Sequence, residues 1–307
     1  MTTTNAAVST PPLLTKEHRR KAWLSRSLIL PALTFGIVLT QIPFLVTIYF
    51  SLLNWNLLKP KEIGFAWFKN YISVFSAGDL IPSVIATVGI TGSAVILSLL
   101  FGLMFAILLD RKFRGQALAR TLIITPFLIM PAAASLIWKY SMFDTSVGVI
   151  NWVVTSLGFP AIAWSTDLPL ATVIIVLTWQ FTPFMMLILL AGLQSQSKEV
   201  LEASSVDGSG AIRTFQWITL PHLRQYIDIA VLLGTIMLLQ VFDPVAIMTK
   251  GTGGTKTLAY LLYERAFIGL DVGQAAAYGV VTVVLTIVVA TIALRTLFKV
   301  FMAGGQR

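Results

Sequence analysis

Six mostly apolar stretches, separated by shorter polar segments, dominate the hydropathy pattern of the chain. Each reaches the length of about 20 residues that an α-helix needs to cross a bilayer. The pattern therefore predicts an all-α integral membrane protein with six transmembrane helices. The predicted spans are Leu28–Leu53, Ile81–Leu109, Leu118–Tyr140, Leu170–Leu193, Ile227–Thr249 and Gln274–Phe298.

The two sides of the membrane differ in positive charge. With the N-terminus inside, fifteen of the 22 Lys and Arg residues fall on the inner side. The positive-inside rule therefore predicts that both termini are cytoplasmic, in a multi-pass protein of a bacterial inner (plasma) membrane. Residues 1–27 are predicted to be a disordered cytoplasmic tail before an uncleaved signal anchor. Residues 28–307 are predicted to form one transmembrane domain, with a cytoplasmic loop at about 194–225.

The amino-acid composition excludes several classes of protein and of functional site. The chain is 56% hydrophobic and 11% charged, which excludes an ordinary soluble domain. It has no cysteine and only two histidines, His18 and His222, so thiolate catalysis and a multi-histidine metal site are excluded. The net charge of +9 is spread over short loops. It therefore predicts contact with membrane lipid and no nucleic-acid partner.

Prolines interrupt four of the predicted spans, and each removes a backbone donor and favours a kink. Two interpretations stay open. The kinks could serve ordinary packing, or they could shape the helices around a substrate path. The prolines are Pro31, Pro43, Pro126, Pro131, Pro183 and Pro244.

The cytoplasmic loop has a helical pattern of its own. Ser197 is placed to cap a short helix, and Gly208 can end that helix in a left-handed conformation. A second short helical pattern follows, and Pro221 closes it. We expect two short helices joined at a sharp bend. A plain connector between two spans would be shorter, so we expect a partner to bind this loop.

The amino-acid sequence of this loop resembles the EAA loop of type I ABC-importer permeases. The matching residues are Glu202-Ala203-Ser204, Asp207-Gly208 and Ile218-x-Leu220-Pro221. The resemblance implies that Glu202 pairs with a basic residue of a cytoplasmic ATPase and that Gly208 shapes the bend. It also implies that four further residues help to shape the loop: Ala203, Asp207, Leu220 and Pro221. Ser204 stands where Ala is usual, and Gln225 stands where a second Pro often follows.

Motifs elsewhere resemble the carbohydrate branch of these permeases, in particular the maltose-type first subunit without its large extra periplasmic domain. They are Leu30-Pro31-Ala32-Leu33, Phe68-Lys69-Asn70-Tyr71, residues 110–115 and Trp138. A narrower resemblance, to mannitol/sorbitol-type members, rests on Leu220-Pro221-His222-Leu223, Leu258–Tyr263 and Leu270-Asp271-Val272-Gly273.

This resemblance implies an importer of several chains. The present chain would be a transport subunit and not an enzyme, with no ATPase motif and no cofactor of its own. Two copies of a cytoplasmic ATPase would bind ATP and Mg. A second homologous permease would complete the translocation path, and an extracytoplasmic solute-binding protein would deliver a sugar or sugar alcohol.

A polyhydroxy substrate needs hydrogen-bonding side chains beside flat apolar surfaces. The candidates for the substrate path are Trp179, Gln180, Phe184, Gln240, Phe242 and Asp243. A carboxylate at membrane depth is costly, which marks Asp243 as functional. The alternative is that Asp243 lies at the outer interface, hydrated or paired with Lys250.

Three other functions make different demands on the sequence. An ion-coupled secondary transporter would use Asp243 or Asp228 as its coupling acid. A membrane-embedded enzyme is disfavoured because the chain has few histidines and no paired carboxylates within its spans. A passive channel would not need Glu202 and Gly208 in their loop.

Overall fold

The fold is known from a computed structural model, which describes the backbone of residues 16–302 and the side chains of residues 29–292. The chain divides into two units, residues 1–49 and residues 50–307. The first unit contains nearly all of α1, Lys16–Ser51. This helix begins before the predicted boundary at Leu28 because Lys16–Arg26 is rich in helix-forming Lys, Arg, Glu and Ala. Of the tail predicted to be disordered, residues 16–27 belong to α1, and residues 1–15 lie outside the described residues.

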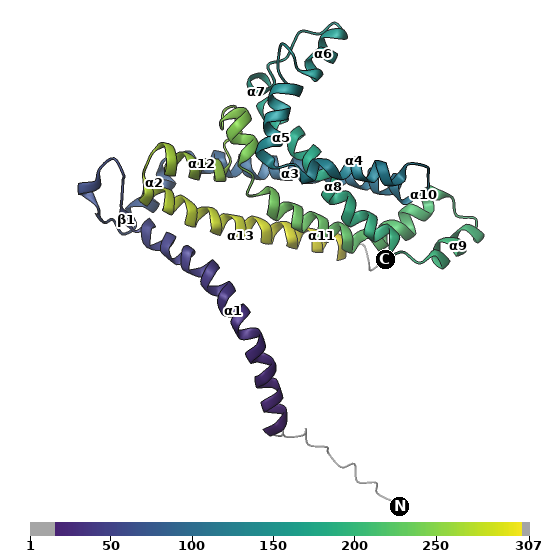
Figure 1. Cartoon of the computed structure of the whole chain (residues 1–307), viewed down its shortest axis with the longest axis horizontal. Coiled ribbons are helices and arrows are strands. Elements are labelled where there is room, and N and C mark those ends of the chain that lie inside the picture. The colour runs from purple at the N-terminus through teal and green to yellow at the C-terminus, as the bar shows by residue number, and fades with distance from the viewer. Residues whose placement is uncertain (1–15, 303–307) are drawn as a thin grey trace, which may run out of the picture. The chain divides into compact units, whose positions relative to one another are not determined.

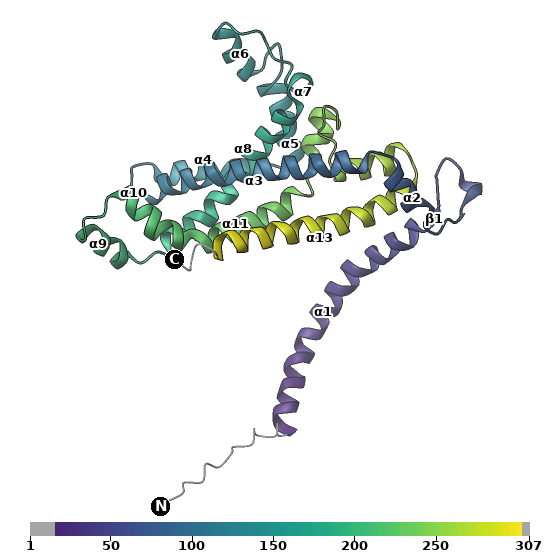
Figure 2. The same ribbon diagram turned by 180° about the vertical axis from the view of Figure 1, so that it is seen from behind.

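Four helices of the second unit run side by side (Figures 1 and 2): α3, Leu80–Asp110; α8, Pro169–Gln194; α11, Leu220–Leu238; and α13, Val272–Met302. The predicted second, fourth and sixth spans agree with α3, α8 and α13 to within a few residues. The main core lies between α3, α8 and α11, where fully buried side chains include Ile90, Leu109, Leu177, Met185, Leu189 and Leu223.

Buried hydroxyl groups add hydrogen bonds between these helices. Thr91 donates to the Leu238 carbonyl over 3.1 Å, and Ser98 donates to the Thr178 carbonyl over 3.4 Å. Small hydroxyl residues are suited to this role, because they let helices approach closely and satisfy polar groups within an apolar environment.

The third predicted span is broken. Helix α4, Gln116–Leu128, is followed at Pro131 by α5, Pro131–Ile137, and a π-helical turn, η2, Trp138–Met142. The two parts are bent by 102°. Pro131 lacks an N–H and holds Met130 in an extended conformation, so the helix cannot continue through this point.

The fifth predicted span, Ile227–Thr249, is not one helix either. Helix α11 ends at Leu238, and after a break the chain resumes as the π-helical turn η4, Val245–Thr249. The break contains Gln240, Asp243 and Pro244, which are poor residues for the interior of an apolar helix. Within the described residues, four helices are long and apolar enough to span a membrane, or five if the bent pair counts as one span. The count of six stays a prediction.

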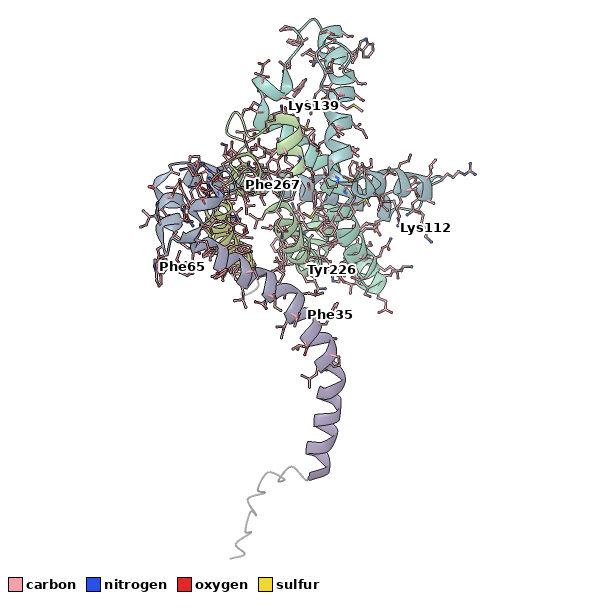
Figure 3. The ribbon with its side chains drawn as sticks, turned by 60° about the vertical axis from the view of Figure 1, so that its left-hand side comes forward. Phe35, Phe65, Lys112, Lys139, Tyr226 and Phe267 are labelled. Carbon is pink, nitrogen blue, oxygen red and sulfur yellow. The ribbon has the colours of Figure 1, made fainter. Side chains whose placement is uncertain are left out.

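Short elements occupy the two ends of this helical bundle. At one end, which we call the hairpin end, lie β1 (Leu53–Asn54), η1 (Pro60–Glu62), β2 (Gly64–Phe65), α2 (Lys69–Ser76), α12 (Leu258–Tyr263) and η5 (Glu264–Ile268). At the other, the knob end, lie α9 (Lys198–Val206), α10 (Ala211–Thr214) and η3 (Phe215–Thr219). Helices α6 (Val149–Ser156) and α7 (Trp164–Asp167) project from between the two ends. Figure 3 shows Phe65 of the hairpin and Lys112, in the loop after α3, on opposite sides.

Candidate transport and coupling sites

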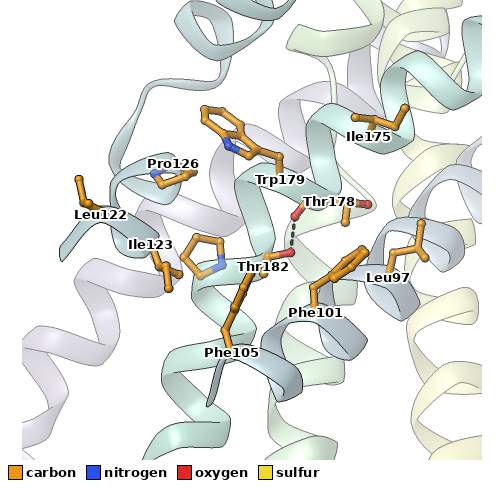
Figure 4. Close-up of a pocket in the computed structure, with 11 residues that line it drawn as sticks. Leu97, Phe101, Phe105, Leu122, Ile123, Pro126, Ile175, Thr178, Trp179 and Thr182 are labelled. Atoms are coloured by element: carbon orange, nitrogen blue, oxygen red, sulfur yellow. Dashed lines mark hydrogen bonds between the residues drawn. The ribbon is translucent and has the colours of Figure 1, made fainter. Parts of the chain in front are cut away.

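A pocket of about 590 Å³ lies between α3, α4 and α8 (Figure 4). It contains one of the predicted path residues, Trp179, and both Pro126 and Pro183 border it. Its other walls are Leu97, Phe101, Phe105, Leu122, Ile123, Ile175, Thr178 and Thr182. The Thr182 hydroxyl donates to the Thr178 carbonyl over 2.6 Å. The pocket therefore offers a mostly apolar surface with few hydrogen-bonding groups.

Gln180, on α8, contacts the backbone at the break between α4 and α5. Its side chain is buried, and Nε2 donates to the Ile129 carbonyl over 2.9 Å. That carbonyl stands where the helix ends, so it has no partner within α4. The Oε1 atom of Gln180 is buried without a hydrogen-bond partner among the described residues. The amide thus satisfies backbone at the corner. Its predicted contact with substrate stays a prediction.

Aromatic rings connect α8 to the elements around this corner. Trp179 packs edge-on against Trp138 with ring centroids 5.5 Å apart, and Phe184 stacks on Phe127 at 5.3 Å. The three path residues predicted on α8 therefore all contact residues at or near the α4–α5 corner.

The other predicted path residues lie at the second break, after α11. Gln240 is exposed, while Phe242 and Asp243 are half-buried. The Phe242 ring centroid lies 5.0 Å from that of Tyr263 and 6.3 Å from that of Tyr260. Sequence reasoning did not single out these two tyrosines, although it quoted the segment Leu258–Tyr263. Within the described part of the chain, no hydrogen bond or ring contact joins this group to the group on α8.

The loop between α8 and α11 folds as predicted into short helices around a bend at Gly208. Gly208 has φ +76°, Ser209 N donates to the Ser204 carbonyl over 3.0 Å, and Gly208 N donates to the Ser205 carbonyl over 3.1 Å. This pair of bonds is a Schellman motif, which satisfies the last carbonyls of α9 and needs a left-handed residue. Ser197 precedes α9 as predicted, but its side chain makes no capping hydrogen bond.

We call residues 198–219 the knob. Ser204 is the buried residue of α9, and its hydroxyl lies 3.1 Å from that of Thr214 on α10. This contact holds the two arms of the knob together. The sequence shows Ser204 where Ala is usual, but it does not indicate the contact with Thr214, because that contact forms only in the folded bend.

The outer surface of the knob is exposed and mixed in chemistry. Glu202, Ala203 and Asp207 are exposed, as are Leu220 and Pro221 where the knob meets α11. Three large apolar side chains are also exposed: Val206 at 87%, Ile212 at 76% and Trp217 at 75%. Large apolar side chains with this degree of exposure are available for contact with another protein.

The hairpin end is held by a denser set of polar contacts. Asn70, within the quoted Phe68–Tyr71 motif, donates to the carbonyls of Ser51 and Leu53, each over 2.8 Å. The Tyr71 hydroxyl lies 2.7 Å from that of Ser51. These bonds fix the chain where it leaves α1 and enters the hairpin.

An ion pair lies beside them. Asp79, just before α3, accepts hydrogen bonds from Arg265 and, over 2.6 Å, from the Tyr278 hydroxyl on α13. Burial acts to raise the pKa of Asp79, but the hydrogen bonds from Tyr278 and Arg265 outweigh it and hold that pKa below its ordinary value. Burial acts to lower the pKa of Arg265, and the hydrogen bond to Asp79 outweighs it, so that pKa is raised. Both groups therefore stay charged at neutral pH.

The family model described as "Binding-protein-dependent transport system inner membrane component" matches residues 98–302 of the chain. The chain belongs to this family. The match begins within α3 and covers α8, both helix breaks and the knob. The chain is thus a multi-pass component of an inner-membrane transport system and not an enzyme.

Curated relatives resemble the chain over most of its length. A probable ABC transporter permease of Sinorhizobium fredii is 34% identical over 274 residues, with 88% of each chain covered. The trehalose/maltose transport system permease of Thermococcus litoralis is 31% identical, covering 90% of this chain and 94% of the relative. The sulfoquinovosyl glycerol transport system permease of Agrobacterium fabrum is 33% identical, with 87% and 88% covered.

Solved structures agree on the fold. A chain of a bacterial ABC transporter involved in the import of the acidic polysaccharide alginate superposes with a TM-score of 0.75 at 17% identity, covering 92% of this chain and 98% of that one. A chain of the MetNI methionine ABC transporter superposes with a TM-score of 0.51 at 18% identity, covering 73% and 95%. The chain therefore has the ABC-importer permease fold that the resemblance implied.

Proposed function

We propose that the chain is one of two membrane-spanning subunits of an ATP-driven importer for a sugar or sugar alcohol. Family membership supports the binding-protein-dependent transport. The names of two relatives, for trehalose/maltose and for sulfoquinovosyl glycerol, support a carbohydrate-like substrate. Family membership does not favour the ion-coupled transporter based on Asp243 or Asp228. Within the carbohydrate class, a mannitol- or sorbitol-like polyol remains our first choice.

The observation that carries the coupling role is the shape and surface of the knob. The bend at Gly208 presents Glu202 together with the exposed side chains of Val206, Ile212 and Trp217. We infer that the knob docks on a cytoplasmic ATPase, with Glu202 facing a basic residue. ABC transporters use two ATPase subunits, and this chain supplies one knob. A second permease and two ATPases therefore complete the complex, and ATP and Mg bind to the ATPases.

For the substrate path we propose the two helix breaks. Discontinuous helices place free backbone groups and polar side chains at membrane depth, where transporters bind solutes. The break after α11 supplies Gln240 and Asp243 beside the rings of Phe242, Tyr260 and Tyr263. The corner beside α8 supplies the ring of Trp179. ATP-driven motion of the knob would rock the two permeases and expose the path alternately to the two sides.

Two measurements test this function. The complex is purified from native membranes through a tag on this chain, and its composition and ATP hydrolysis are measured. We expect a second permease, two ATPases per complex and substrate-dependent hydrolysis. Purification of this chain alone from membranes that still transport the substrate would contradict the proposal. Uptake of labelled mannitol, sorbitol, trehalose and maltose by cells with and without the chain then identifies the substrate.

Glu202→Lys tests the docking contact directly. Reversing one charge of a docked ion pair costs about 2–5 kcal/mol, which is more than tenfold in affinity. We expect uptake to fall to background while the amount of chain in the membrane stays constant. Normal uptake in this variant would contradict docking through Glu202.

A further inference from the structure

The two ends of the knob meet at a cluster of four residues, which we call the base clasp. Gly192 lies in the last turn of α8, and Ser195 follows that helix. His222 and Tyr226 lie in the first two turns of α11. The Ser195 Oγ atom is 3.0 Å from His222 Nε2, 2.8 Å from the Tyr226 hydroxyl and 2.8 Å from the Gly192 carbonyl. One serine hydroxyl therefore connects the helix that enters the knob with the helix that leaves it.

The donors and acceptors of the base clasp are consistent with one arrangement. The Ser195 hydroxyl donates to the Gly192 carbonyl and accepts from the Tyr226 hydroxyl. With its proton on Nε2, His222 donates to Ser195 Oγ and also lies 3.2 Å from the Gly192 carbonyl. The Gly192 carbonyl, in the last turn of α8, also accepts from the backbone N–H of Ser195 over 3.3 Å. The side chains of Ser195 and His222 add donors to this end of the helix.

The backbone at Gly192 is shaped for this contact. A Cβ atom at this position would lie 2.6 Å from Cγ of Tyr226 and 2.8 Å from a methyl group of Leu223. The ring of Tyr226 therefore packs directly on the backbone of α8. At this point α8 and α11 touch without an intervening side chain from α8, which makes the junction stiff.

We propose that His222, with Ser195 and Tyr226, is a positioning cluster that transmits movement of the knob to α8 and α11 as one body. The proposal rests on the docking of the knob on an ATPase. The knob is internally fixed by the Ser204–Thr214 contact and the Gly208 turn. The second arm of the knob runs without a break through η3 into α11, whereas a short non-helical link, residues 195–197, joins the first arm to α8. Movement of the knob therefore reaches α8 and α11 together when the two helices are tied at its base. The base clasp is the set of contacts that ties them.

The test compares transport with hydrolysis in the purified complex reconstituted in proteoliposomes. His222→Ala removes the imidazole donor, while His222→Gln keeps a side-chain N–H of similar reach. We expect the amount of substrate imported per ATP hydrolysed to fall about threefold to tenfold in His222→Ala, the effect of losing one hydrogen bond. We expect His222→Gln to restore most of this ratio, which a purely structural defect in hydrolysis or assembly would not predict.

A matched pair of variants controls for the loss of a tyrosine hydroxyl. Tyr226→Phe breaks the contact with Ser195, and Tyr71→Phe breaks the contact of the same kind, 2.7 Å long, with Ser51 at the hairpin end. We expect Tyr226→Phe to lower the import per ATP and Tyr71→Phe to leave it unchanged. Equal ratios in His222→Ala, Tyr226→Phe and the unmodified complex would overturn the proposal. So would an equal loss in Tyr71→Phe and Tyr226→Phe.

Glu202→Lys in the same preparation distinguishes a failure of knob docking from a failure of transmission through the base clasp. If Glu202→Lys abolishes coupling and the base-clasp variants keep the normal ratio, the knob docks as proposed and the base clasp is not its transmission element. If Glu202→Lys keeps normal coupling, docking itself is wrong, and the base clasp loses its proposed role with it.

Discussion

The hairpin end and the knob end are both closed by hydrogen bonds, but the bonds connect different parts of the chain. At the hairpin end, Asp79 binds Arg265 and Tyr278, which are 186 and 199 residues away in sequence. At the knob end, Ser195 binds His222 and Tyr226, which are 27 and 31 residues away. The first arrangement joins α3, η5 and α13 into one fixed platform. The second ties only the two ends of one loop, α8 and α11, and joins no other helix.

The largest effect on stability is expected from Arg265→Ala. This change leaves the Asp79 carboxylate, which is 20% exposed, without its cationic partner. Loss of the partner of a partly buried charge costs about 1–3 kcal/mol of stability. We expect a value near the lower end of that range, because both side chains are partly exposed to solvent. Thermal unfolding of the detergent-solubilised complex measures the loss of stability as a lower Tm.

The matched control is Lys59→Ala at the same end. Lys59 and Glu62 form an ion pair of 3.5 Å whose side chains are more than 60% exposed. An exposed pair of this kind contributes little, so we expect no measurable change in Tm. Equal shifts in the two variants would show that the Asp79–Arg265 pair does not hold the hairpin end.

A smaller effect, confined to the knob, is expected from Gly208→Ala. Gly208 has φ +76° with open space around it, so an added Cβ meets no neighbour and the cost is backbone strain alone. A left-handed alanine costs about 1 kcal/mol. We expect faster hydrogen exchange in residues 203–211 and reduced uptake, with little change in Tm. Gly210→Ala is the control, since Gly210 has φ −69° and open space.

The smallest effect is expected from Ser204→Ala, which restores the residue usual at this position. It removes the contact with Thr214, and a hydrogen bond of this type contributes about 0.5–1.5 kcal/mol. We expect slightly faster hydrogen exchange at the α9–α10 bend. Ser205→Ala is the control, because the hydroxyls of Ser204 and Ser205 both donate to the Leu201 carbonyl. Identical exchange rates in the two variants would show that the Ser204–Thr214 contact does not stabilise the knob.

Features with a local cause could be predicted from the sequence. The apolar run of α8 was expected at Leu170–Leu193 and is found at Pro169–Gln194. The bend at Gly208 was expected because a helix that ends in a left-handed residue needs glycine there, and its φ confirms this. In both cases the signal lies within the segment itself.

Features that depend on distant partners could not be predicted. The sequence shows Pro131 but not a bend of 102°, which also depends on Gln180, 51 residues from the carbonyl that it satisfies. The pairing of Asp79 with Arg265 and the ring contacts of Phe242 with Tyr263 join segments whose approach follows from packing. A polar residue within a span indicates a special environment, but the sequence cannot say whether it serves backbone or ligand.

The corner between α4 and α5, bent by 102°, places a helix end within an apolar part of the protein. A broken helix leaves a carbonyl without its helical partner, and at apolar depth a side chain, a neighbouring helix or an ordered water must satisfy it. Here the buried Gln180 amide takes that place on the Ile129 carbonyl. The Ile129 carbonyl is therefore satisfied by a side chain of the neighbouring helix α8. One amide from that helix lets the backbone turn sharply within an apolar environment.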